Sequence, residues 1–321
     1  MQLNLPVLEH LQDSDNILIA GAGGGFDIFC GLPIYFTLRE MDKTVHLANY
    51  SFSTLPLIQR ISDPEILVEG TLIGTRGDVR THIGYSPESY LTEWFMNVRD
   101  EEVPVWTFQK VGVKLLHQLY IKLINHLNID AIIMIDGGVD SLMIGDEEGA
   151  GTLLEDTVSL TAVSQLDVPV KILACLGFGA ELEVSHHNAL MNMAALIKAG
   201  AFLGSCALTK QMPVYTQYES ACRYVWEQPE HHKSHINMRV VSATQGETGN
   251  HHMYHDYRPL EVYVSPLMSL YWFFDADAVN ARSLLAPHLK DTVDIQDAWN
   301  ITMKLRSKKN AINKLQRKLP Y

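Results

Sequence analysis

The sequence has few cysteines and no closely spaced cysteine pair. Its four cysteines, Cys30, Cys175, Cys206 and Cys222, form no CxxC motif. Such wide and irregular spacing indicates neither a disulfide framework nor a zinc knuckle. Because free thiols suit a reducing compartment, we expect a cytoplasmic protein.

Long apolar runs and a dense covering of charge are also missing. No stretch reaches about 18 uninterrupted apolar residues, so we expect no membrane span. Residues 1–15 contain no basic segment followed by an apolar run, so we expect no signal peptide. Charged residues make up only 19% of the chain, which favours strands buried on both faces and also a homo-oligomer that hides part of its surface.

Acidic residues are missing from the C-terminal end. Residues 302–321 hold seven Lys or Arg and no acid, although the whole chain has a formal net charge of −12. A body this acidic is a poor partner for nucleic acid or an anionic membrane. We expect residues 304–321 to form a basic helical tail, either solvated or folded back on the acidic body.

Short apolar segments alternate with helical ones along the rest of the chain. Strands are predicted over 16–22, 44–52, 103–108, 130–136, 170–176, 201–207 and 237–243, and helices over 26–41, 111–127, 152–165, 185–199, 215–226 and from 294 onward. Residues 53–103 are less regular, and the type of the apolar segment 267–274 stays open. The alternation predicts one doubly wound α/β domain over residues 1–303, with a mostly parallel sheet, helices on both faces and a Rossmann-like first βαβ unit.

A glycine-rich turn follows the first predicted strand. Its expected ligand-binding residues are Gly21, Gly23, Gly24, Gly25 and Asp27, together with Asn49 at the end of the next strand. Glycines let backbone N–H groups approach a phosphate or carboxylate, and a helix N-terminus favours negative charge. The dinucleotide fingerprint is incomplete, since Phe26 stands at the third glycine position and Asn49 where an acid is expected. A tight turn without a ligand, with Asp27 capping the helix, stays an alternative.

An acidic, glycine-rich block follows the strand predicted to end at Asp136. Seven acids fall between Asp136 and Asp156, interleaved with glycines that include Gly137 and Gly138. Crowded carboxylates repel one another unless a cation, an arginine or a hydrogen-bonding ligand lies among them. We expect Asp136, Asp140 and Asp146 to hold Mg²⁺, or the hydroxyls of a sugar, and these residues or Glu147 to supply a base. An exposed acidic loop is the alternative.

A third loop follows the strand that ends at Leu176. Gly177 and Gly179 in this loop are expected to line the same rim as the acidic block, in a loop that continues to Glu181. Cys175 precedes them inside a buried strand, where a cysteine is more often a small apolar residue than a nucleophile.

The loop histidines and a pair of arginines are two further groups of candidate functional residues. The histidines are His186, His187, His231, His232, His235, His251, His252 and His255. They form no HExxH motif, so exposed loop histidines are the simpler interpretation, although His186, His235 or His251 could act as a general base. Arg76 and Arg80 could clamp a phosphate or form salt bridges with the acidic loops.

The glycine turn at 21–27 combined with the block from Asp136 to Asp156 resembles a family of bacterial and archaeal proteins called domain of unknown function 1152 (DUF1152). The resemblance covers most of the chain and implies a single α/β unit. The family name implies no activity and no catalytic roles.

The sequence thus predicts an enzyme that binds a phosphorylated or nucleotide-like small molecule where the strands end. Group transfer or hydrolysis, assisted by Mg²⁺, fits the motifs better than hydride transfer. A small-molecule sensor without turnover and an oligomeric scaffold are the alternatives.

Overall fold

A nine-stranded sheet runs through the computed structural model, which describes residues 6–77, 84–147, 153–228, 233–254 and 262–308. Its order is β3-β4-β5-β2-β1-β6-β7-β9-β8. The strands are β1 (Asn16–Gly21), β2 (Thr44–Ser51), β3 (Glu65–Val68), β4 (Leu72–Thr75), β5 (Val105–Gln109), β6 (Ala131–Gly137), β7 (Val170–Leu176), β8 (Phe202–Ala207) and β9 (Leu270–Asp275). The fold is therefore α/β, as the alternating pattern predicts.

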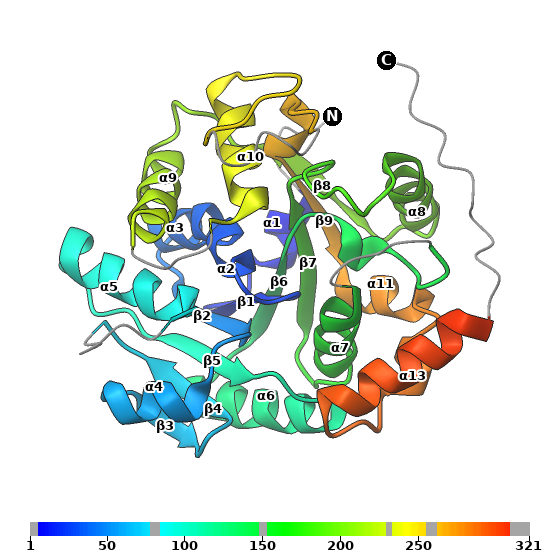
Figure 1. Ribbon diagram of the computed structural model, residues 1–321, viewed down its shortest axis with the longest axis horizontal. Coiled ribbons are helices and arrows are strands. Elements are labelled where there is room, and N and C mark those ends of the chain that lie inside the picture. Colours follow the sequence, from blue (N-terminus) through cyan, green and yellow to red (C-terminus); the bar gives the residue numbers. More distant parts are fainter. Residues whose placement is uncertain (1–5, 78–83, 148–152, 229–232, 255–261, 309–321) are drawn as a thin grey trace.

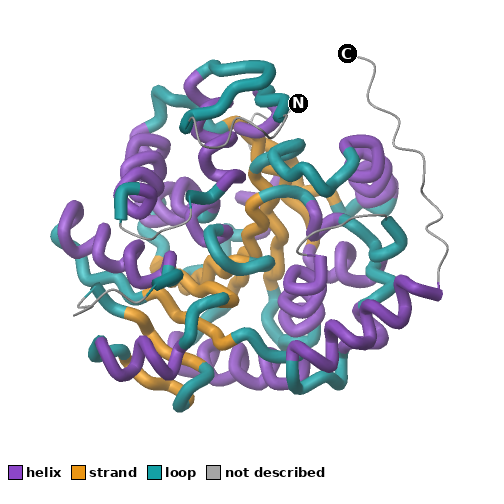
Figure 2. Tube along the Cα trace, viewed as in Figure 1, coloured by secondary structure: helices purple, strands orange, loops and turns teal. Residues whose placement is uncertain are grey.

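Helices cover both faces of the sheet (Figures 1 and 2). The longer ones are α3 (Leu32–Glu40), α5 (Pro87–Arg99), α6 (Val113–Leu127), α7 (Leu153–Ser164), α8 (His186–Lys198), α9 (Pro213–Trp226), α10 (His235–Gln245) and α13 (Ile295–Lys308). The shorter ones are α1 (Pro6–His10), α2 (Asp27–Cys30), α4 (Leu55–Ile61), η1 (Asp140–Leu142), η3 (Pro266–Ser269), α11 (Ala276–Arg282) and α12 (Ala286–Leu289). None of the described helices has the length and apolar character that crossing a bilayer requires.

The doubly wound arrangement holds at the centre of the sheet only. The five strands β5-β2-β1-β6-β7 pair in parallel. Towards the edges, β4 is antiparallel to both β3 and β5, and β9 is antiparallel to both β7 and β8. The expected mostly parallel sheet is thus confirmed for the strands that carry the motifs and corrected at both edges.

Two apolar cores lie on the two faces of the sheet. Along β1, Ile17 and Ile19 belong to one core, and Leu18 and Ala20 belong to the other. Successive strand side chains point to opposite faces, so a strand covered on both sides must be apolar at every position. The continuous apolar run of β1 therefore follows from its central place in the sheet.

The segment 237–243 is a correction to the sequence analysis, since it lies in helix α10 and is no strand. Val240 and Val241 suggest a strand locally, yet both are fully buried within the helix. Ser234 accepts a hydrogen bond from the Asn237 backbone N–H, and Gly246 ends the helix in the left-handed conformation. These caps and the tertiary packing outweigh the β propensity of the valines.

Other predicted boundaries also change. The helix expected over 26–41 is two helices, α2 and α3, with Gly31 between them. The irregular section 53–103 contains α4, β3, β4 and α5, and the open segment 267–274 becomes η3 and strand β9. The basic tail begins as the last turns of α13, where Arg306 donates to the Glu147 carbonyl at 3.0 Å; residues 309–321 lie outside the described part.

Candidate functional site

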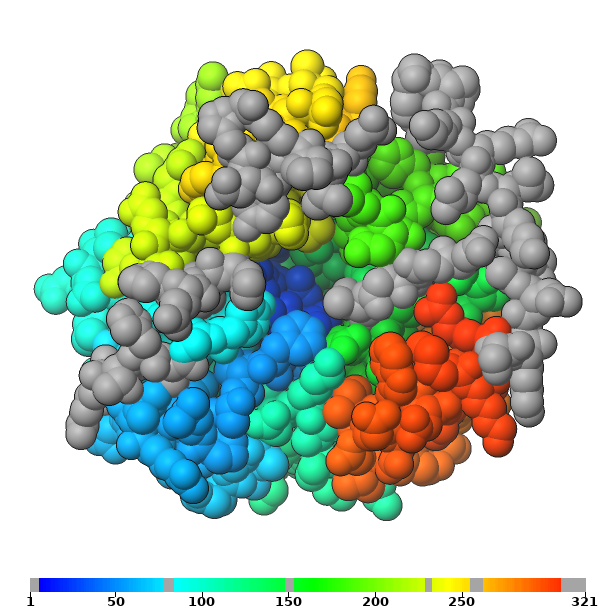
Figure 3. Space-filling model, viewed as in Figure 1, coloured from blue at the N-terminus to red at the C-terminus, as the bar shows by residue number. Residues whose placement is uncertain are grey.

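The candidate site lies where the direction of the sheet's connections reverses. From β1 the chain passes to the neighbouring β2, and it later returns to β6 on the other side of β1. In open α/β sheets this switch point leaves a crevice outside the carboxyl ends of the two central strands. Figure 3 shows a hollow on this face, with the blue N-terminal part of the chain at its bottom.

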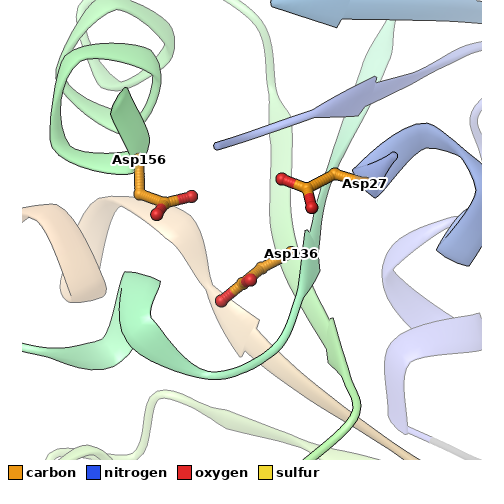
Figure 4. Close-up of side chains that lie close together, drawn as sticks. All are labelled: Asp27, Asp136 and Asp156. Carbon is orange, nitrogen blue, oxygen red and sulfur yellow. The ribbon is translucent and has the colours of Figure 1, made fainter. Parts of the chain in front are cut away.

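Five carboxyl groups meet in this crevice. Asp27 begins α2 after β1, Asp136 lies near the end of β6, and Asp156 lies in the first turn of α7. One carboxylate oxygen from each of these three residues lies within 4.8 Å of the other two, and Figure 4 shows their side chains pointing toward a common centre. Asp136 belongs to a second group of the same size, with Asp140 and Glu181.

The carboxylates of the centre differ in burial. Asp136, Asp140 and Asp156 are buried. Asp27 and Glu181 are partly exposed and lie at the solvent side of their groups. These two residues are therefore the part of the centre nearest to solvent.

Backbone amides of the glycine turn point at Asp27. Its carboxylate accepts hydrogen bonds from the N–H groups of Gly23 at 2.7 Å and Gly137 at 3.2 Å. The sequence pattern predicts an anionic ligand bound to the N–H groups of the glycine turn. The protein's own carboxylate takes these donors, so the glycine turn primarily orients Asp27.

The glycines also leave the space that the carboxylates need. A Cβ atom on Gly23 would lie 2.9 Å from the nearer oxygen of Asp156. A Cβ on Gly138, whose φ is +141°, would lie 2.3 Å from the carboxyl carbon of Glu181. Any side chain at these positions would displace a carboxylate, which explains why glycines and acids are interleaved in the sequence.

Asn49 orients the turn from the next strand. Its amide nitrogen donates to the Gly25 carbonyl at 2.9 Å and to the buried carboxylate of Glu88 at 2.6 Å. Glu88 also accepts a hydrogen bond from Ser53 at 3.1 Å. Asn49 thus holds the turn in place, while Glu88 lies in the irregular section 53–103, where the sequence analysis selected only Arg76 and Arg80.

Hydrogen bonds are distributed unevenly over the carboxylates. Asp136 accepts from the Ser141 N–H at 3.2 Å and from the Ser141 hydroxyl. Glu181 accepts from the Val139 N–H at 2.8 Å. In contrast, both oxygens of Asp156 are buried without any hydrogen-bond partner in the described part of the chain, and its side chain is 1% exposed. An unsatisfied buried carboxylate is costly, so Asp156 requires a proton or a ligand.

Burial and mutual repulsion favour the protonated state of these groups. Burial, followed by the charge of Asp140, raises the pKa of Asp27 to about 7. The same causes in the same order raise the pKa values of Asp136, Asp156 and Glu181 well above their ordinary range. At neutral pH the centre without a cation therefore carries protons that a bound cation would displace.

Two acids of the expected site do not join either carboxylate group. Neither Asp146 nor Glu147 belongs to a group of described residues able to share a metal ion. The Glu147 carboxylate accepts the backbone N–H groups of Ile144 and Gly145, each at 2.8 Å, and the Asn192 amide at 3.1 Å. Glu147 consequently holds its own turn together.

Asp156 and Glu181 complete the two groups, although the sequence analysis did not select them as ligands. In the sequence, Asp156 is the last acid of the acidic block, and Glu181 is the end of the third loop. Gly177 and Gly179 shape that loop, both with positive φ. Their position after a neighbouring strand was the signal that pointed to Glu181.

The remaining candidate residues belong to neither carboxylate group. The two possible metal-binding groups among the described residues contain no histidine, and His231, His232 and His255 lie outside those residues. Burial raises the pKa of the Cys175 thiol well above its usual range, which disfavours a nucleophilic role. Arg76 pairs with Glu65 at 3.1 Å and Glu102 at 3.2 Å, and Arg80 lies outside the described part.

A family described as "Protein of unknown function (DUF1152)" matches residues 89–309, more than half of the chain. The matched segment includes Asp136, Asp140, Asp156 and Glu181, while Asp27 precedes it. No curated protein and no solved structure matches the chain.

The stability of the cation-free protein should fall as the pH rises. The raised pKa of Asp27 means that the folded protein keeps a proton that the unfolded chain has already lost, from about pH 4 up to about pH 7. The free energy of unfolding, measured with urea in the presence of EDTA, should be at least about 2 kcal/mol lower at pH 8 than at pH 5.

Asp140→Asn should flatten this pH dependence, because the charge of Asp140 contributes to each of the four raised pKa values. The control Asp13→Asn removes an exposed charge and should leave the slope as it is. Equal stability of the unmodified protein at both pH values would contradict this account.

Proposed function

We propose that this chain, which belongs to the DUF1152 family, is a divalent-cation-dependent enzyme that hydrolyses, or transfers a group from, a phosphorylated or nucleotide-like small molecule. The observation that carries the proposal is Asp156, with two buried oxygens that no described residue satisfies. A cation would satisfy this carboxylate, and the bound cation would attract an anionic substrate.

A hard divalent cation suits the donors of the centre. Mg²⁺ and similar ions prefer carboxylate oxygens, and Asp27, Asp136 and Asp156 bring three of these within 4.8 Å. An arginine or lysine could also satisfy a buried carboxylate, but no ion pair in the described part of the chain involves Asp156. The neighbouring Glu155 is the residue that pairs with Lys110.

The charge of the centre supports an anionic substrate that binds together with the cation. The ionised carboxylates alone would repel a phosphate group, and the nearest backbone amides already bind Asp27. A bound cation would polarise a phosphoryl oxygen and lower the pKa of a coordinated water. The residues of this chain would fix its position, leaving the partly exposed side at Asp27 and Glu181 for the substrate.

Asp136 supports a centre with two cations. It belongs to both groups of three, which together contain five carboxylates. One divalent ion would leave much of that charge uncompensated inside a partly buried crevice, whereas two ions would nearly balance it. Many enzymes of phosphoryl chemistry use two metal ions about 3.5–4 Å apart, joined by a shared carboxylate.

Asp156→Asn should weaken Mn²⁺ or Mg²⁺ binding by at least about 10-fold, because it removes the carboxylate that has no other partner. Isothermal titration calorimetry would measure the affinity. Titrations in two buffers of different ionisation enthalpy should also show proton release at pH 7, and the affinity should rise with pH as the carboxyl groups lose their protons.

Asp13→Asn serves as the control, because it changes the net charge equally at an exposed position. Binding that is equally tight in Asp156→Asn, or unchanged between pH 6 and pH 8, would remove the basis of the cation centre.

The unmodified protein should bind two Mn²⁺ ions whose electron paramagnetic resonance signals are magnetically coupled. Asp156→Asn and Glu181→Gln should each leave one ion without coupling, since each affects only one group. Asp136→Asn should weaken both sites. A stoichiometry of one in the unmodified protein would contradict the second cation and leave a mononuclear centre in place.

A thermal-shift screen with nucleotides and sugar phosphates should find compounds that stabilise the protein only when Mg²⁺ or Mn²⁺ is present. Products from these compounds, followed by ³¹P NMR, should form at least about 100-fold more slowly with Asp136→Asn, since a transition-state contact is lost. Stabilisation without any product would favour a sensor, and turnover in the presence of EDTA would contradict cation dependence.

A further inference from the structure

A small pocket beside α10 gathers nitrogen-bearing side chains that the cation centre does not use. Its water-accessible volume is about 20 Å³, and it opens to solvent. His235 and Arg239 line it from α10, and His251 and His252 line it from the segment that follows. Because the chain as a whole is acidic, with a net charge of −12, this pocket differs in character from most of the molecule.

Arg239 is a buried cation with few acceptors. It is 8% exposed, and its guanidinium donates one hydrogen bond, to the Ala180 carbonyl. A guanidinium has five N–H donors, so most of them have no acceptor among the described residues. Burial lowers the pKa of Arg239, although the group still stays charged at neutral pH.

The histidines add further donors to the pocket. His252 lies with Nε2 3.0 Å from the Asn250 side-chain oxygen, and His251 lies with Nδ1 3.4 Å from the Glu247 carboxylate. Each of these contacts uses one ring nitrogen and leaves the other. Burial, followed by the charge of Arg239, lowers the pKa of His235, which favours the neutral ring near pH 7.

Carboxylates near the pocket offset part of its positive charge. Glu181 and Glu183 both act on the charge of Arg239, and Glu183 also acts on His235. Glu183 is exposed and Glu181 belongs to the cation centre, so neither takes up the remaining guanidinium donors through a hydrogen bond. The guanidinium of Arg239 therefore remains the main positive charge of the pocket.

We propose that this pocket binds a small oxyanion, a phosphate or carboxylate group, with Arg239 as its main charged partner. A guanidinium matches two oxygens of such a group in a bidentate geometry, and imidazole N–H groups can complete the contacts. The site is separate from the cation centre and needs no metal. The carbonyl of Ala180 links the two, because Arg239 binds it and Glu181 follows it.

The test uses the full chain in EDTA, with inorganic phosphate and acetate titrated separately. Histidine Cε1–H signals in ¹H–¹³C NMR spectra report on His235, His251 and His252 directly. At least one anion should produce saturable shifts of these signals, and the anion that binds more tightly identifies the group that the pocket recognises. Unshifted signals with both anions would overturn the proposal without the need for any variant.

Three variants sharpen the result. Arg239→Gln should lower the affinity for the anion by at least 10-fold. Arg239→Lys, which keeps the charge but loses the bidentate geometry of the guanidinium, should lower the affinity less. Glu183→Gln should strengthen binding by about 2-fold to 5-fold, because it removes an exposed opposing charge. Asp156→Asn should leave anion affinity unchanged. Equal affinity in Arg239→Gln would overturn the proposal, and this outcome is independent of whether cations bind.

Discussion

The repulsion between carboxylates in one crevice constrains the structure around the candidate site. Burial is the first cause of every raised pKa there, and the charge of Asp140 is the second. The fold offsets part of this cost with amide donors to Asp27 and with Ser141 beside Asp136. It leaves Asp156 without such help, so a ligand of positive charge completes the arrangement better than any further residue of the chain.

The sheet topology brings these acids together from positions far apart in the sequence. Asp27 and Asp136 meet because β1 and β6 are neighbours and end at the same edge. Asp156 and Glu181 approach from the segments that follow β6 and β7. Each strand contributes one loop to the crevice, and the glycines in these loops allow the backbone to pass close to the carboxylates without a Cβ in the way.

Apolar runs were enough to predict the central strands, because a strand covered on both faces must be apolar throughout. The rule that ligands bind at strand ends then selected Asp27, Asp136 and Asp140 correctly as neighbours. Local pattern could not predict α10, where packing overrides the β propensity of Val240 and Val241. It also could not separate Asp156 from Asp146, because only tertiary structure decides which acid of the block lies beside Asp27 and Asp136.

The structural role of the glycine turn could not be predicted from its sequence alone. A turn of this kind after a first strand usually suggests that backbone N–H groups bind a phosphate. Here the N–H groups of Gly23 in the turn and of Gly137 at the end of β6 donate to the Asp27 carboxylate instead. An anionic substrate would then depend on cations for its attraction to the crevice. The glycines and the acids consequently act together. The backbone N–H groups orient the Asp27 carboxylate, and the carboxylates together would bind a cation.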